Sequence, residues 1–94
     1  MSNLSEDPSE RSRRYIATLE KALQQHNALK ERRTVEAADI ETISDAIHRY
    51  LQDARFYLDS GKPTTSLASI AYAEGLLDAL KFLNLTKAVE SNAQ

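Results

Sequence analysis

Two carboxylates lie one helical turn apart in the otherwise apolar stretch SIAYAEGLLDAL, which spans residues 69–80: they are Glu74 and Asp78. Carboxylate-rich helical bundles use such pairs to hold magnesium or iron, but those sites take ligands from at least two helices and often add histidines. Asp53 could contribute from the preceding helix, and the hydroxyl of Tyr72 could share a small polar pocket with it. These four residues are therefore candidate ligands for a metal ion or for another small ligand.

Two other interpretations of Glu74 and Asp78 need no ligand. The pair can form the solvent-exposed stripe of its helix, with Lys81 neutralising Asp78 from three residues away. The pair can also bind cations on another helix or on a second copy of the chain, and the candidates are Arg49, Arg55 and Lys62. The sequence leaves all three interpretations open.

No motif for covalent or metal-assisted catalysis accompanies the carboxylates. The chain has no cysteine, no Gly-x-Ser-x-Gly sequence, no glycine-rich phosphate loop and no Glu-x-x-His motif. Its two histidines are not spaced as a metal-binding pair; we expect His26 on the apolar side of its helix and His48 at the surface. We therefore assign no catalytic residue, no metal-ligand set and no cofactor.

Length and charge bound the class of protein. With 94 residues, the chain is expected to form one helical domain over residues 1–94. Its 12 basic and 14 acidic residues give a net charge of -2, which does not indicate nucleic-acid or membrane binding. Two short basic groups, at residues 11–14 and 30–33, leave RNA binding as an alternative. The polar start, the lack of a long apolar run and the absence of cysteine predict a cytoplasmic protein.

Helix-forming residues dominate, and apolar residues recur every three or four positions, which predicts three long helices. We place them at about residues 8–30, 36–59 and 64–83, and we expect frayed tails at residues 1–6 and 86–94.

Capping residues indicate where these helices start and stop. Asp7 followed by Pro8 is typical of a helix start, and Thr34 could cap the second helix. Gly61 and Asn84 can adopt the left-handed conformation that closes the second and third helices, with the residue after Asn84 folding back over the last turn. The short connection after Gly61 makes these two helices an antiparallel pair.

The third predicted helix is apolar around more than half of its circumference, whereas an ordinary surface helix buries an arc of little more than about 100°. Ala71, Gly75 and Ala79 form a ridge of small residues at a spacing of four, where another helix can approach closely. We therefore predict an all-α, antiparallel three-helix bundle that self-associates through its C-terminal helix, most simply as a homodimer. The expected contact residues are Ala71, Gly75, Ala79, Phe56, Leu76 and Leu80.

Part of the sequence resembles a known family. The residues that carry the resemblance are Asp53-Ala54, Tyr57-Leu58, Gly61 and the run from Ala68 to Leu80, which contains YAEGLLDAL. Over residues 53–83 the chain looks like domain of unknown function family 357. The resemblance implies an all-helical bundle in a cytoplasmic archaeal protein, without an established activity or catalytic residue. It directs attention to Tyr72, Glu74, Gly75 and Asp78, which belong to that phrase.

These observations favour a non-enzymatic protein–protein interaction or assembly module, whose partner is a second copy of the chain or another protein. One alternative is a divalent-metal-dependent binder or hydrolase of a nucleotide or phosphate ligand that uses Glu74 and Asp78. Another is an RNA-associated accessory domain. No role at a membrane is expected.

Overall fold

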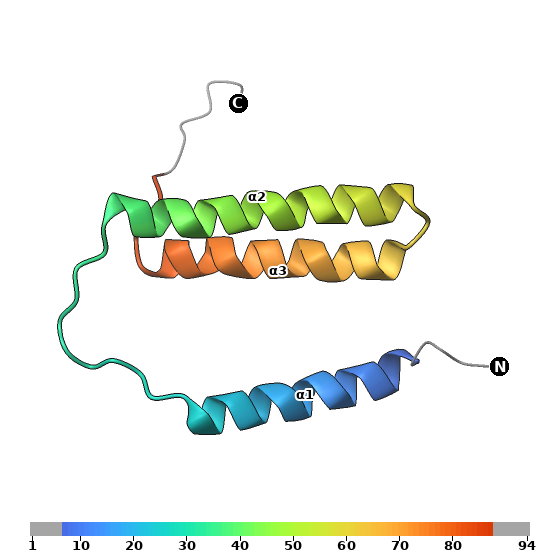
Figure 1. Cartoon of the computed structure of the whole chain (residues 1–94), viewed down its shortest axis with the longest axis horizontal. Helices are drawn as coiled ribbons and strands as arrows, with labels where there is room; N and C mark the ends of the chain where they lie inside the picture. Colours follow the sequence, from blue (N-terminus) through green and yellow to red (C-terminus); the bar gives the residue numbers. More distant parts are fainter. Residues whose placement is uncertain (1–6, 88–94) are drawn as a thin grey trace. The chain divides into compact units, whose positions relative to one another are not determined.

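The structure is a computed structural model that describes residues 7–87. Within this range all regular secondary structure is helical: α1 spans Pro8–Gln25, α2 spans Ala37–Asp59 and α3 spans Pro63–Phe82 (Figure 1). The all-α class, the three helices and the packing of α2 against α3 are confirmed. Of the predicted frayed tails, residues 1–6 and 88–94 lie outside the described residues.

The chain divides into two units after Arg32. The first unit contains α1, and the second contains α2 and α3. A single domain over residues 1–94 stays a prediction. Among the described residues, none of the helices combines the length and the apolar character that a bilayer-spanning segment requires.

Helix α1 starts as predicted but ends early. The side chain of Asp7 accepts a hydrogen bond from the backbone N–H of Glu10 at 2.8 Å, and Pro8 occupies the first helical position. The helix stops at Gln25, five residues before the predicted end, because the backbone of His26 is extended, with φ -77° and ψ 135°. His26 is therefore the C-cap and not part of the helical stripe. The polar residues from Gln24 to Asn27 give a further turn no apolar face to bury, and short unsupported helical turns are marginal in water.

Within its own unit, α1 presents an uncovered apolar stripe. Tyr15 and Ile16 are each 57% exposed, and Leu19 and Leu23 are each 60% exposed. The guanidinium carbon of Arg14 lies 4.8 Å from the centre of the Tyr15 ring, which is within the range of a cation–π contact. In the described part of this unit, α1 is thus an amphipathic helix whose apolar side is not covered by the other described residues of the unit.

Helix α2 begins at Ala37, and Thr34 does not cap it. The N-cap is Glu36, and the carboxylate of Asp39 accepts a hydrogen bond from the backbone N–H of Glu36 at 2.9 Å. This is one half of the reciprocal bonding of a capping box, in which the third helical residue reaches back to the cap. The Thr34 prediction was wrong because Asp39 supplies the helix start instead.

Gly61 closes α2 in the predicted left-handed conformation, with φ 78°. The N–H of Gly61 donates to the carbonyl of Leu58 at 3.2 Å, and the N–H of Lys62 donates to the carbonyl of Tyr57 at 2.8 Å. These two bonds form a Schellman motif, which satisfies carbonyls at the helix end and reverses the chain. Pro63 then starts α3, so the connection is short and the two helices run antiparallel, side by side (Figure 1).

The end of α3 repeats this geometry. Asn84 has φ 58°, and its N–H donates to the carbonyl of Lys81 at 3.0 Å, while the N–H of Leu85 donates to the carbonyl of Leu80 at 2.8 Å. The prediction of a left-handed stop at Asn84, with the next residue folded back, is confirmed.

The contact between α2 and α3 is built on small side chains near the turn. Ala54 is only 2% exposed, and the buried hydroxyl of Ser66 donates a hydrogen bond to its carbonyl at 2.7 Å. In α3 the buried residues are Ser66, Ala73 and Leu80, which lie seven residues apart. A spacing of seven keeps one side of a helix facing its partner along the whole contact. This side of α3 is the inner face of the hairpin.

Candidate functional site

The side of α3 that points away from α2 is also apolar. Phe82 follows Ala73 by nine residues, or about two and a half turns, so it lies on the opposite side of the helix. Phe82 is 82% exposed and Leu67 is 69% exposed. We call this surface the α3 outer face; its members, all exposed, are Leu67, Ala68, Ala71, Tyr72, Gly75, Asp78, Ala79, Phe82 and Leu83.

Gly75 lies in the middle of the α3 outer face. A Cβ atom added at Gly75 would meet no heavy atom within 4 Å, and its φ is not positive, in contrast to that of Gly61. Neither backbone geometry nor packing within the hairpin therefore requires a glycine at this position. Ala71 and Ala79 are exposed on the same ridge, so the predicted small-residue ridge is open to solvent.

The six predicted contact residues do not share one surface. Ala71, Gly75 and Ala79 belong to the α3 outer face. Leu80 is 6% exposed and is buried against α2, and Leu76 is half-buried. Leu80 is covered because it follows Ala73 by seven residues and so shares the inner face.

Phe56 lies on α2 and is exposed, as its position opposite the apolar stripe of that helix predicts. Its ring meets the ring of Tyr57 edge-on, with the centroids 5.4 Å apart. Phe56 is therefore an exposed apolar residue on the outer side of α2, separate from the α3 outer face.

The carboxylates of Glu74 and Asp78 are exposed on α3. Within residues 7–87 neither forms a hydrogen bond or an ion pair, so Lys81 does not pair with Asp78. The candidate cations Arg49, Arg55 and Lys62 do not reach either carboxylate in this part of the chain.

Asp53 does not join the two carboxylates of α3. Because Ser66 faces Ala54, Asp53 lies near the level of residue 67, which is about 10 Å along the helix axis from Glu74. Among the described residues, no three histidine, aspartate or glutamate side chains are grouped closely enough to hold a metal ion.

Tyr72 lies at the border between the inner face of α3, which packs on α2, and the α3 outer face. Its ring stacks on the ring of Tyr50 from α2, with centroids 4.3 Å apart and an angle of 27° between the ring planes. Such offset stacking stabilises a pair of helices beyond the area it buries. Tyr72 therefore contributes to the α2–α3 contact while more than half of its surface stays exposed.

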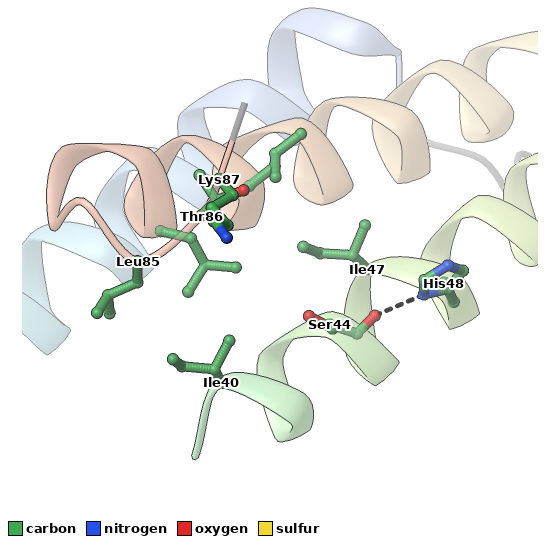
Figure 2. A pocket seen from close by; sticks show the side chains of 9 residues that line it. Ile40, Ser44, Ile47, His48, Leu85, Thr86 and Lys87 are labelled. Atoms are coloured by element: carbon green, nitrogen blue, oxygen red, sulfur yellow. Dashed lines mark hydrogen bonds between the residues drawn. The ribbon is translucent and has the colours of Figure 1, made fainter. Parts of the chain in front are cut away.

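A groove of about 330 Å³ lies at the end of the hairpin where α2 begins and α3 ends. In Figure 2, Ile40, Ser44, Ile47 and His48 line it from α2, and Leu85, Thr86 and Lys87 line it from the segment after α3. The Nδ1 atom of His48 donates to the carbonyl of Ser44 at 2.9 Å. The fold-back of Leu85 forms one wall of the groove, and the sequence did not reveal this groove, because its walls come from distant segments.

A family model described as a protein of unknown function, DUF357, matches residues 14–86. The chain belongs to the DUF357 family. No curated protein and no solved structure matches it.

The DUF357 match is wider than the resemblance at residues 53–83, since it also includes most of α1 and the segment before α2. Within the phrase YAEGLLDAL, Ala73 and Leu80 are buried on the inner face of α3. Tyr72, Glu74, Gly75 and Asp78 of the same phrase are all exposed. Glu74, Gly75 and Asp78 thus lie away from α2, whereas Tyr72 stacks on Tyr50 of that helix.

Proposed function

We propose that this DUF357 protein is a non-enzymatic interaction module that assembles through the α3 outer face. The observation that carries the proposal is that α3 is apolar on both sides: its inner face packs on α2, while Leu67 and Phe82 remain mostly exposed. Contiguous exposed apolar surface is typical of sites that bind another protein.

Burial of this surface supplies the driving force. Full burial of one leucine or phenylalanine side chain contributes about 1.5–3 kcal/mol. Leu67 and Phe82 lie at the two ends of the face, and small residues lie between them. A second helix fits such a surface best, because small side chains let two helix axes approach closely along their length.

The α3 outer face presents apolar area with charges at one edge, a combination that suits binding of another protein. The expected partner is a second copy of the chain, since symmetric dimers are the commonest protein assemblies. The absence of cysteine supports a cytoplasmic location, and the family resemblance supports an archaeal source.

The test is the mass of the full chain in solution from low to high micromolar concentration. Sedimentation equilibrium should show a mass that rises above the 10.5 kDa of one chain. Phe82→Glu should abolish the rise, because it places a charge in the proposed contact. Leu29→Glu is the control, since Leu29 is also mostly exposed, at 68%, and lies outside α3.

A mass of one chain at every concentration would contradict assembly through self-association. An equal effect of Leu29→Glu would assign the contact to another surface.

A further inference from the structure

The α3 outer face is complementary to the same face of a second copy of the chain. This inference rests on the function proposed above. We propose that two copies pair through α3 in antiparallel orientation, with a two-fold axis that passes between Leu77 and Asp78. In an antiparallel pair of this symmetry, a residue before the axis in one chain lies opposite the residue of the other chain that follows the axis by the same number of positions. Two independent features of α3 point to this same axis.

The first feature is one of shape. Phe82 is the large apolar residue that projects furthest from α3, at 82% exposed. Ala71 and Gly75 lie one turn apart on the same side of the helix, and a Cβ at Gly75 would point into open space. An aromatic ring packs well into a notch between two such residues. The stated axis brings Phe82 of each copy to the middle of the notch between Ala71 and Gly75 of the other.

The second feature is one of charge. Glu74 and Lys81 lie along the same edge of the α3 outer face, because seven residues separate them. Glu74 has no partner within residues 7–87. Glu74 and Lys81 are equally far from the proposed axis, on opposite sides of it. Each Glu74 therefore meets Lys81 of the other copy, and the dimer contains two such ion pairs.

The same axis gives Asp78 a different role. Asp78 lies next to the axis, so the two copies of this carboxylate come close together, and like charges repel. The two exposed acids of α3 are then opposite in effect: Glu74 favours the pair and Asp78 opposes it. This difference makes the dimer reversible and makes the register testable with single substitutions.

Charge variants test the register in the full chain by sedimentation. Glu74→Lys and Lys81→Glu should each weaken dimerisation several-fold, and the double variant should restore it. Asp78→Asn should strengthen dimerisation. Glu41→Lys, which reverses an exposed charge on α2, is the control and should leave the dimer unchanged. Failure of the double variant to restore binding, or weakening by Asp78→Asn, would overturn this register.

Disulfide trapping gives the orientation separately, because the chain has no cysteine of its own. Glu74→Cys mixed with Lys81→Cys should form a mixed disulfide under oxidation, and Asp78→Cys should cross-link to itself. Cross-linking of Ala71→Cys to itself would indicate parallel helices, because the antiparallel register keeps the two copies of Ala71 about 20 Å apart along the helix axis. The register proposed here would then fail while assembly through α3 would stand. A wild-type chain that stays monomeric throughout would remove both.

Discussion

The hydroxyl of Ser66 and the carbonyl of Ala54 form a hydrogen bond of 2.7 Å across the hairpin, twelve residues apart in the sequence. This bond joins α3 to α2 at a contact between small residues, and both residues are buried. It also sets the register of the two helices, since every other facing pair follows from it along antiparallel axes. The hairpin is therefore sensitive to the size and polarity of the side chain at position 66.

Ser66→Ala should lower the free energy of unfolding by about 0.5–1.5 kcal/mol, because it removes one buried intramolecular hydrogen bond. Ser66→Leu should lower it by more, since extra methylenes in a close-packed contact commonly cost about 1–3 kcal/mol. Urea denaturation followed by circular dichroism measures both. Ser69→Ala, on the same helix, removes a hydroxyl that forms no hydrogen bond within residues 7–87, so it should leave stability nearly unchanged.

The two glycines should respond in opposite directions to alanine. Gly75→Ala should raise the melting temperature, because a Cβ there meets no atom within 4 Å and alanine is favoured over glycine in a helix by about 1 kcal/mol. Gly61→Ala should lower the melting temperature, because φ is 78° and an L side chain is strained in that region. If Gly75→Ala instead lowers the melting temperature of the single chain, the space next to Gly75 is not open as described.

Gly75→Ala carries a second expectation that concerns association. The same Cβ that stabilises the helix narrows the notch proposed to receive Phe82 of a second copy. The variant should therefore melt at a higher temperature at low concentration and yet dimerise more weakly by sedimentation. Ala68→Gly is the contrasting variant, since it weakens the helix without filling the notch.

Asn84 ends α3 with φ 58°, and its substitutions should rank by their tolerance of the left-handed region. Asn84→Gly should be neutral or stabilising, because glycine adopts this conformation freely. Asn84→Val should destabilise the chain by about 1–2 kcal/mol, and it should loosen the groove that Leu85 helps to form. Thermal melting gives the ranking, and equal stability of the valine and glycine variants would contradict the capping role.

Magnesium or manganese at millimolar concentration should not raise the melting temperature. Glu74 and Asp78 are both exposed, and two carboxylates supply only part of the roughly six oxygen ligands that these ions take. A bound ion would stabilise the fold by an amount that grows with its concentration. A concentration-dependent rise that is lost in Glu74→Gln would restore the ligand interpretation of this pair.

The helix ends could be predicted where a single residue determines them. Asp7, Gly61 and Asn84 each act through local backbone geometry, which a sequence displays directly. The end of α1 could not be placed, because no such stop residue follows Gln25 and the last turn depends on what the helix packs against. The start of α2 was predicted to within one residue. Only its cap was wrong, because Asp39 caps the helix from inside, three residues after Glu36.

The candidate site was only partly predictable for a different reason. The outer position of Gly75 and the exposure of Phe56 follow from helical spacing. Leu80 was placed on the wrong surface, because α3 is apolar on nearly all sides and its hydrophobic pattern does not show which side faces α2. Contacts across the two helices, such as those of Ser66 with Ala54 and of Tyr72 with Tyr50, fix that choice.

The seven-residue recurrence of Ser66, Ala73 and Leu80 makes the hairpin modular. Seven residues are about two helical turns. If seven residues were removed from α2 and the matching seven from α3, the same sides of the two helices would still face each other. Natural insertions or deletions within this pair should consequently come in matched blocks of this length, whereas an unmatched change of one residue would rotate half of the seam into water.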